Sequence, residues 1–235
     1  MDPEQRTYRE WPARPAGTVA WTRPASDHAS TTRILPDGCT DIMWHDDQLV
    51  VAGPDTVAQL NHTGPGRPYE ALRFAPGLGP AVLGVPGDAL RDQRVPLSAL
   101  WAAGAVRDLT DRLREARSPA ARVAILEDTA AERLRRTRPD PVTATIARHL
   151  RDGATVAASA SAVGLSERQV HRRSLAAFGY GPKTLARILR MQRAVALARA
   201  GRAFADVAAD AGYADQAHLA REVKALAGVP LGSVG

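Results

Sequence analysis

Two stretches of this sequence carry polar side chains suited to reading the edges of DNA bases. In the first stretch these are Arg168, Gln169, His171 and Arg172, and in the second they are Gln216, His218 and Arg221. Bases in the major groove are told apart by side chains that donate or accept hydrogen bonds in pairs, chiefly arginine to guanine and glutamine or asparagine to adenine. These residue types therefore predict contact with specific sequences of double-stranded DNA.

The elements that must hold these side chains repeat one local pattern. Each reading segment, residues 166–179 and 215–228, begins at an N-cap residue, Ser166 or Asp215, whose side-chain oxygen can accept a hydrogen bond from the first helical turn. Each ends at a glycine, which suits the left-handed position after a helix. In both, 13 positions separate the cap from the glycine, and an arginine follows the cap by six positions. A single polar helix face is usually only solvated surface, but duplication at fixed spacing favours DNA reading.

A helix of small residues and a glycine turn precede each reading segment, so each stretch predicts a helix-turn-helix motif. Residues 182–199 join the two motifs and predict one helix, because Pro182 suits a helix start and apolar residues recur at spacings of three and four. At about 1.5 Å per residue this helix spans on the order of 26 Å. Successive major grooves lie roughly 34 Å apart. One chain could therefore read two half-sites.

The positive charge is confined to the half of the chain that contains the repeat. The 235 residues are 45% hydrophobic and carry a net charge of +6, which predicts a soluble globular protein. Residues 142–235 contain 13 Lys or Arg and 6 Asp or Glu, so this segment carries +7 and the remainder −1. An Arg-rich genome without selection on charge predicts an excess everywhere. The observed division favours a polyanion-binding domain joined to a domain of another function.

The N-terminal half predicts a domain of a different class. Short strands separated by turn residues are expected at residues 19–21, 33–35, 40–44, 49–52 and 71–74. From residue 97 the apolar spacing becomes helical, with helices at 105–117 and after Ser118. We therefore expect an α+β chain. Residues 1–138 form a domain that is strand-rich over 1–95, as a small sheet or partial cupin-like barrel, and helical over 97–138. Residues 139–235 form an all-α domain with two helix-turn-helix motifs.

Residues 142–234 resemble the C-terminal domain of AraC/XylS-type transcription regulators. The resemblance is carried by Ser166, Val170, Arg172, Pro182 and residues 190–194 and 206–221. It implies that the base-reading side chains named above face DNA, and it adds Ala217 to the interface. Ser174 and Val223 stand where the family usually has Phe, so we expect Phe178 and Leu226 to fill the space behind the reading segments, or the packing there to be looser. Residues 231–234 lack the aromatic and arginine that often close the domain.

The N-terminal half resembles the sensor-like domain that precedes this DNA-binding domain in some actinobacterial regulators. Residues 35–44, 51–54 and 72–77 carry the resemblance, which implies binding of a small effector. The candidate effector-binding residues are aromatic or polar: Trp11, Trp21, Cys39, Asp41, Trp44, Tyr69 and Arg73. Each aromatic residue alone is more often part of a core than of a ligand wall.

Three functional readings remain open from the sequence. The first is an AraC-type regulator modulated by an effector, the second a constitutive or architectural DNA binder whose N-terminal domain only dimerises, and the third a thiol-based sensor using Cys39. The single cysteine excludes an internal disulfide and a Cys-rich zinc site. No nucleophile, base or metal set stands at a recognisable spacing, including the set of His28, His45 and His62 with nearby aspartates. We expect no enzyme activity, cofactor or metal.

The remaining expectations concern location and partners. Residues 1–6 are charged and no apolar run approaches the roughly 20 residues that span a bilayer, so the sequence predicts a cytoplasmic protein without membrane contact. Double-stranded DNA is the expected partner. An activator would also contact RNA polymerase. The helices expected at residues 105–138 could pair two copies into a homodimer, or could simply cover their own sheet.

Overall fold

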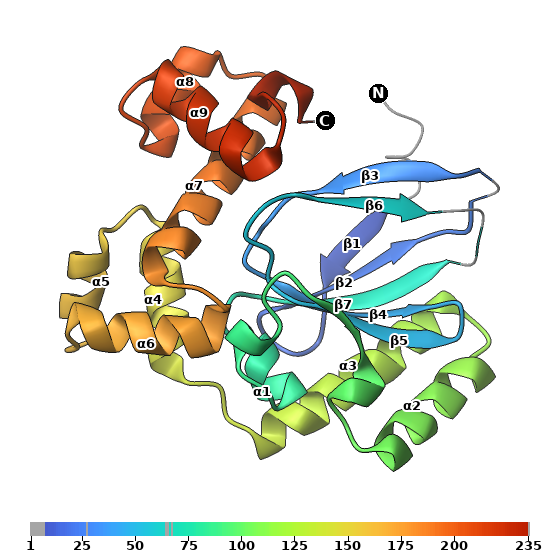
Figure 1. The fold of residues 1–235 in the computed structure, drawn as a ribbon. Coiled ribbons are helices and arrows are strands. Elements are labelled where there is room, and N and C mark those ends of the chain that lie inside the picture. Colours follow the sequence, from blue (N-terminus) through green and yellow to red (C-terminus); the bar gives the residue numbers. More distant parts are fainter. Residues whose placement is uncertain (1–7, 27, 64–65, 67, 235) are drawn as a thin grey trace.

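The computed structural model describes residues 8–26, 28–63, 66 and 68–234, so the charged residues 1–6 lie outside the described part. The strands occupy the N-terminal half of the chain and the C-terminal half is helical (Figure 1). This confirms the predicted fold class. No helix in the described ranges combines the length and apolar character needed to cross a membrane. The boundary near residue 138 remains a prediction.

The strands form two antiparallel sheets. The larger, six-stranded sheet has the order β1-β2-β7-β4-β5-β8. Its strands are β1 (Arg9–Pro12), β2 (Thr18–Arg23), β7 (Tyr69–Phe74), β4 (Thr40–His45), β5 (Gln48–Ala52) and β8 (Arg94–Pro96). The smaller sheet pairs β3 (Ser30–Ile34) with β6 (Gln59–Thr63). The prediction of a small sheet therefore holds, whereas β1, β6 and β8 had no predicted counterpart.

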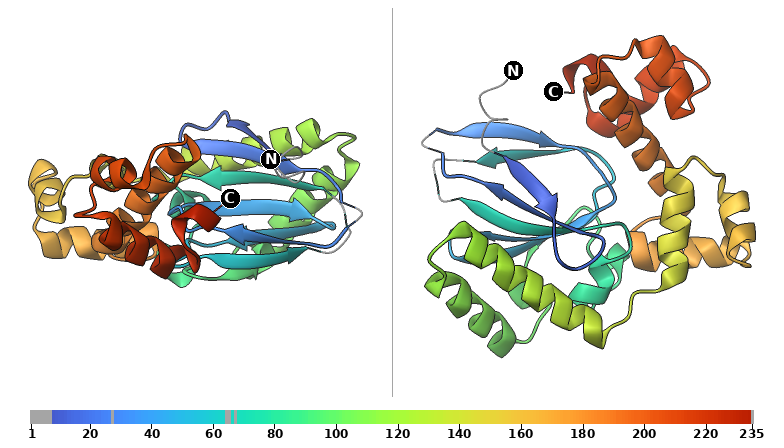
Figure 2. Two further views of the ribbon diagram at one scale, coloured as in Figure 1. Left: turned by 90° about the horizontal axis from the view of Figure 1, so that it is seen from above. Right: turned by 180° about the vertical axis from the view of Figure 1, so that it is seen from behind.

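The six-stranded sheet has one face packed on helices and one face turned towards the β3–β6 ribbon (Figure 2). Side chains alternate between the faces along each strand. Ile42, Trp44 and Leu72 belong to the core against the helices. The residues at the alternate strand positions lie on the other face. Asp41 and Arg73, which pair across β4 and β7, are two of them. We call this second face the open face.

The helices of the N-terminal half cover the core face of the sheet. They are α1 (Gly79–Leu83), α2 (Ala103–Glu115) and α3 (Pro119–Arg136), with the 3-10 turns η2 (Gly87–Ala89) and η3 (Leu97–Ala99). A buried ion pair joins α3 to β7, because Arg122 Nη1 donates to Glu70 Oε1 at 3.1 Å. Burial raises the pKa of the Glu70 carboxyl, and the Arg122 guanidinium opposes that rise. Removing Arg122 would leave a buried carboxylate without its partner.

The C-terminal half consists of two helix pairs arranged around one long helix. Its elements are α4 (Pro141–Arg151), α5 (Val156–Ala162), α6 (Glu167–Phe178), α7 (Pro182–Arg199), α8 (Phe204–Ala211), α9 (Gln216–Ala227) and the 3-10 turn η4 (Leu231–Ser233). Phe178 and Leu226 are buried in its core, beside Ser174 and Val223. These two side chains therefore occupy the space behind the helices, as predicted. Leu231 closes the core from η4 in place of an aromatic residue.

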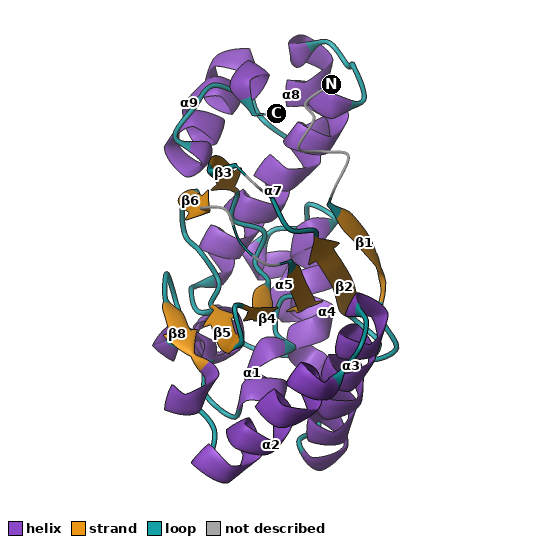
Figure 3. Cartoon of the chain, turned by 90° about the vertical axis from the view of Figure 1, so that its right-hand side faces the viewer, coloured by secondary structure: helices purple, strands orange, loops and turns teal. Residues whose placement is uncertain are grey.

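The two halves contact each other at both ends of the C-terminal half. At one end, α6 packs against η2 and α1. At the other, α9 lies beside β3 and β6 (Figure 3), where Ala58 N donates to Leu226 O at 2.7 Å and Arg33 Nη1 donates to Ala227 O at 3.0 Å. Between them, Gln192 Nε2 of α7 donates to Pro36 O at 2.7 Å. The N-terminal half therefore contacts both helix-turn-helix units.

Candidate nucleic-acid interface and interdomain cavity

The first helix-turn-helix unit, α5 and α6, is fixed by local caps. Thr155 Oγ1 accepts from Ala158 N at 3.1 Å at the start of α5. Ser166 Oγ accepts from Gln169 N at 3.3 Å, and the Gln169 side chain returns a bond by accepting from Ser166 N at 2.9 Å. This capping box satisfies two amides that would otherwise lack partners. Gly179 then ends α6 with φ +82°, a conformation that costs glycine little.

The second unit, α8 and α9, has the same arrangement. Asp215 Oδ1 accepts from His218 N at 2.6 Å at the start of α9. Gly228 ends α9 with φ +75°. Gly212 ends α8 with φ +83° and so provides the turn of the motif. The helix bounds and caps agree with the predicted repeat, and we call α6 and α9 the reading helices.

Each reading helix buries one face and exposes the other. Val170 in α6 is fully buried and Leu219 in α9 is 2% exposed. The predicted base-reading residues that lie exposed on the other side are Arg168, His171, Arg172, Gln216, Ala217 and Arg221. Within the described residues, the guanidinium groups of Arg168, Arg172 and Arg221 make no hydrogen bond or ion pair. They are therefore available to an external acceptor.

Two of the predicted base-reading side chains have local partners. Gln169 uses its Oε1 in the capping box, which leaves its Nε2 as the group that can reach outward. His218 is half-buried, accepts from Ala214 N at Nδ1 over 3.3 Å, and packs edge-on against Tyr213 with ring centroids 5.2 Å apart. Both side chains use part of their hydrogen-bonding capacity within their own motif. Fewer of their polar atoms therefore remain for base contact than the sequence suggests.

The arginines of α7 hold the second motif and α4 to the central helix. Arg187 Nε donates to Glu222 Oε1 of α9 at 2.9 Å. Arg190 Nη1 donates to Gly212 O at 3.3 Å, and its guanidinium lies over the ring of Tyr213. Arg193 Nη2 donates to Arg151 O of α4 at 3.0 Å. These contacts fix the second motif and α4 along α7, a role that the sequence pattern did not reveal.

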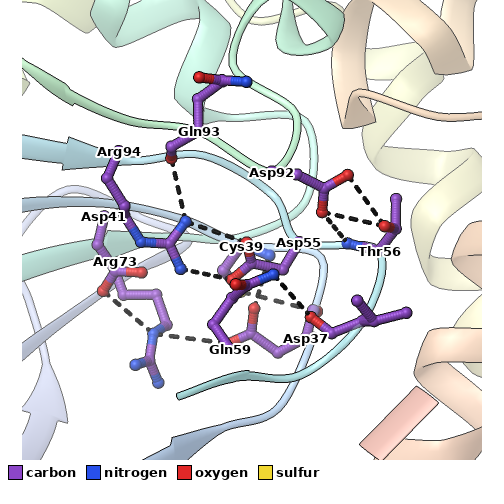
Figure 4. Close-up of polar contacts among 11 residues, drawn as sticks. Asp37, Cys39, Asp41, Asp55, Thr56, Gln59, Arg73, Asp92, Gln93 and Arg94 are labelled. Carbon is purple, nitrogen blue, oxygen red and sulfur yellow. Dashed lines mark hydrogen bonds and ion pairs between the residues drawn. The ribbon is translucent and has the colours of Figure 1, made fainter. Parts of the chain in front are cut away.

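On the open face of the sheet, four of the candidate effector residues form a connected polar cluster. Trp21 Nε1 donates to Asp41 Oδ1 at 2.6 Å, and Arg73 Nε donates to the same oxygen at 3.3 Å. Asp37 adds a second carboxylate 3.6 Å from Arg73 Nε (Figure 4). Cys39 follows Asp37 at the same edge, with its amide donating to Asp37 Oδ1 at 2.8 Å. Burial raises the pKa of the Asp41 carboxyl, and the charge of Arg73 opposes that rise.

A cavity of about 390 Å³ opens beside this cluster, between the two halves of the chain. The N-terminal half lines it with Gly17, Thr18, Val19, Asp37, Cys39, Arg73, Ala75 and Pro76, and the C-terminal half with Arg151, Leu189 and Gln192. The sequence identified Cys39 and Arg73 among these residues. The three residues from α4 and α7 carry no local signal for this position, because only the packing of the two halves brings them there.

The aromatic candidates do not line this cavity. Trp44 is 4% exposed and belongs to the core on the opposite face of the sheet, which corrects its grouping with Asp41. Residues three apart on a strand face opposite sides, so the two cannot share one site on that face. Trp11 lies on the edge strand β1. Tyr69 stacks between Trp21 and His45, with ring centroids 6.3 and 3.7 Å away, and extends the polar cluster away from the cavity.

The environment of Cys39 does not favour a reactive thiol. Burial raises the pKa of the thiol well above its ordinary value, and the carboxylate of Asp37 raises it further. The thiolate is the nucleophilic form of cysteine, so this position disfavours nucleophilic attack. Among the residues that the structure describes, no three His, Cys, Asp or Glu side chains are grouped as metal ligands would be.

The capped helix pairs and their exposed arginines define a DNA-binding protein of the helix-turn-helix class. Residues 159–234 match the family model of a helix-turn-helix domain, and residues 18–96 match that of a domain of unknown function (DUF6597). The C-terminal half of the chain therefore contains a helix-turn-helix domain, as the sequence predicted. No curated protein matches the chain.

Two solved structures similar to the chain are both of ToxT from Vibrio cholerae. ToxT from strain O395 shares 10% identity, with a TM-score of 0.44, over 96% of this chain and 95% of that chain. Wild-type ToxT from strain SCE256 with bound unsaturated fatty acid shares 7% identity, with a TM-score of 0.45, over 98% of this chain and 95% of that chain.

Proposed function

We propose that this protein is a sequence-specific transcription regulator whose N-terminal half adjusts DNA binding in response to a small effector. The proposal of sequence-specific DNA binding rests on the pair of matched reading helices. Each has a buried apolar face and an exposed face that bears an unpaired arginine. A solvated surface would not require two copies with the same caps, length and arginine offset. Both reading helices pack against one helix, α7, and this favours simultaneous insertion into successive major grooves.

The proposed roles of the side chains follow from their chemistry. Arg172 and Arg221, at equal offsets from their caps, would each donate two hydrogen bonds to guanine. Gln216, at the start of α9, suits adenine. Ala217 allows close approach of the helix and contact with a thymine methyl group. The first reading helix carries Arg168 where the second carries Ala217, and His171 where the second carries Ala220, so we expect α6 to contribute more of the specificity.

The proposed influence of the N-terminal half rests on its contacts with the ends of both reading helices. Arg91 Nη1 donates to Gly179 O at 3.2 Å, at the end of α6. Ala58 N and Arg33 Nη1 donate to carbonyls in the last turn of α9. These ends are opposite to the caps near which the base-reading residues lie. A shift of the N-terminal half would therefore move the reading helices without covering their exposed faces.

The DNA part can be tested by selecting duplexes from a random library with the full chain. We expect selection to converge on two half-sites separated by about one helical turn, roughly 10 base pairs. Binding to the selected site should weaken steeply with salt, because phosphate contacts release counterions. Convergence on a single short site would show that only one motif reads DNA, and no convergence would contradict sequence-specific function.

The effector part needs a separate experiment. Small molecules that raise the melting temperature of the full chain identify ligands of the folded state. Linkage requires that an effector coupled to DNA binding change the dissociation constant for the selected site, and that DNA change the affinity for the effector by the same factor. Ligands that bind without this reciprocal effect would favour a constitutive DNA binder whose N-terminal half has another role, such as dimerisation.

A further inference from the structure

We infer that one short segment of the N-terminal half, residues 54–58, sets the distance between half-sites that the protein accepts on DNA. We call it the bridging segment. It contacts the end of α6 at one of its ends and the end of α9 at the other. This inference rests on the proposed function, because it concerns how the two reading helices are placed for simultaneous binding. It assigns the segment no contact with DNA.

The bridging segment touches both reading helices within five residues. Pro54 packs so closely on Gly179, at the end of α6, that a Cβ added at Gly179 would stand 2.7 Å from Pro54 Cγ. Four residues later, Ala58 N donates to Leu226 O, in the last turn of α9, at 2.7 Å. Four Cα–Cα steps of extended chain span at most about 14 Å. The ends of the two reading helices are therefore tied to each other across a short distance.

A second loop of the N-terminal half, residues 90–94, holds the bridging segment in place. Asp92 Oδ1 accepts from Thr56 N at 2.7 Å, and the two Asp92 carboxylate oxygens lie 3.0 and 2.9 Å from Thr56 Oγ1 (Figure 4). Arg94 donates to both carboxylate oxygens of Asp55, at 3.0 and 2.6 Å. Asp55 is 7% exposed, so water competes little for the carboxylate of this bidentate pair.

Backbone packing makes the connection between the two loops stiffer. Asp92 N donates to Pro54 O at 3.1 Å, and Gly53 N donates to Gln93 O at 3.0 Å. A Cβ at Gly53 would stand 1.7 Å from Leu90 O, so only glycine permits this approach. Asp92 itself has φ +57°, a left-handed conformation that aspartate tolerates better than most residues. The bridging segment therefore moves only together with the loop that supports it.

The bridging segment closes a ring of contacts that α7 alone leaves open. Both reading helices pack against α7, and Arg187 Nε of α7 donates to Glu222 Oε1 of α9 at 2.9 Å. Two motifs that share one helical connection can still turn about it, whereas a second connection away from the helix axis resists the turn. Arg91, in the supporting loop, adds to this second connection, because its Nη1 donates to Gly179 O at 3.2 Å. The angle and distance between α6 and α9 are thereby fixed.

Fixed reading helices accept a narrow range of half-site spacings. Adding one base pair between two half-sites moves one of them by about 3.4 Å along the DNA axis and turns it by roughly 35°. A rigid pair of helices can follow only if the DNA is bent or untwisted, which costs free energy. Helices joined by α7 alone can instead follow by moving relative to each other. Release of the bridging segment should therefore broaden the accepted spacing and leave the preferred bases unchanged.

The mechanical part of the inference is tested without DNA. Spin labels at Ser161→Cys in α5 and Ala209→Cys in α8, both exposed positions, report the distance between the two motifs in a Cys39→Ser chain. We expect one narrow distance distribution in the otherwise unchanged chain. Asp92→Gly keeps the left-handed backbone and removes the carboxylate, and Ala58→Pro removes the N–H that binds α9. Each of these two substitutions should broaden the distribution.

The consequence for DNA is tested with duplexes that carry the selected half-sites at the preferred spacing, or with base pairs added or removed between them. For a change of one base pair, wild type should lose at least about tenfold in affinity, and Asp92→Gly and Ala58→Pro less than about threefold. Asp92→Asn should restore the wild-type profile, because asparagine keeps an acceptor for Thr56 N and tolerates the left-handed backbone.

The matched control is Asp46→Gly. Asp46 also has positive φ, +49°, but it lies in the hairpin between β4 and β5, at the end of the sheet away from the C-terminal half (Figure 1). This substitution should leave both the distance distribution and the spacing profile as in wild type.

Each other outcome overturns the inference. Narrow distributions in all variants would show that α7 alone fixes the two motifs. Broadened distributions with an unchanged spacing profile would show that the placement of the helices in the free protein does not set the spacing. An equal change in affinity at every spacing, whether loss or gain, would assign the bridging segment to overall stability or to restraint of DNA binding.

The failure of the inference and the failure of the proposed function are distinguishable. If wild type selects no pair of half-sites, the proposed function fails and the spacing claim fails with it. The distance measurement still shows in that case whether the bridging segment fixes the two motifs. If wild type selects a pair of half-sites but tolerates every spacing as the variants do, only the inference fails.

Discussion

Adding one methyl group at Gly87 should separate α6 from the N-terminal half. Gly87 lies in η2, and an added Cβ would stand 2.7 Å from Gly179 N and 3.3 Å from Ala176 O at the end of α6. Gly87 is not among the glycines with positive φ, so alanine itself is not strained there. The Gly87→Ala substitution therefore acts on the contact between the halves and leaves each half able to form its own elements.

The expected loss of stability follows from how far the added Cβ of residue 87 and the backbone of Gly179 must move apart. Ordinary van der Waals contact for a Cβ begins near 3.4 Å, and the 2.7 Å neighbour is backbone that cannot rotate away. Forcing extra atoms into packed structure typically costs about 1–3 kcal/mol. We expect a loss of that order in the free energy of unfolding. If the packing of α6 on η2 contributes less free energy than the strain costs, α6 should instead separate from η2.

The measurements are urea unfolding and amide hydrogen exchange over residues 176–181. In Gly87→Ala the exchange of this segment should accelerate, because local opening exposes its amides. Gly104→Ala, in α2, is the matched control. An added Cβ at residue 104 has only the Arg107 guanidinium within 4 Å, at 3.9 Å. Equal stability and equal exchange in the two variants would refute the proposed docking of α6 on η2.

Two further predictions concern buried carboxylates. Arg122→Met should lower the free energy of unfolding by about 3–5 kcal/mol in urea melts at pH 7, because it leaves Glu70 buried without its partner; a loss below about 1 kcal/mol would mean that water reaches Glu70. Burial raises the pKa of the Asp41 carboxyl in the folded state above its unfolded value of about 3.9. The stability that this shift contributes is therefore fully present below the unfolded pKa and is lost as the pH rises through the folded-state pKa. Wild type should therefore gain stability relative to Asp41→Asn as pH falls from 7 towards 4, and a constant or opposite difference would contradict the assignment.

The helix-turn-helix repeat was predictable because its signals are local. The N-caps Ser166 and Asp215 and the glycines that end the reading helices act within a few residues, so residue type alone locates α6 and α9. The capping role of Gln169 was also open to prediction, since Ser followed by Gln three positions later is a capping-box pattern. The roles of the α7 arginines depend on which carbonyls and carboxylates the other helices bring near them, and no spacing encodes that.

The N-terminal half was less predictable because its sites depend on pairing between distant segments. Strand β6 is largely polar and is formed only by pairing with β3, so it lacks an alternating apolar pattern. The misplacement of Trp44 was avoidable, because its odd spacing from Asp41 on one strand puts the two on opposite faces. The cavity was not foreseeable, since it joins strand ends of the N-terminal half to Arg151 and Leu189, far along the chain.

The most direct test of the central claim compares DNA affinity for a selected site and a scrambled duplex in wild type, Arg172→Ala and Arg221→Ala. Exposed Arg112 of α2, away from the reading helices, provides the control Arg112→Ala. If the reading helices contact bases, each variant should lose about 1–3 kcal/mol on the selected site and little on the scrambled one, whereas Arg112→Ala should change neither. Equal losses on both duplexes would make these arginines phosphate contacts and contradict sequence reading by α6 and α9.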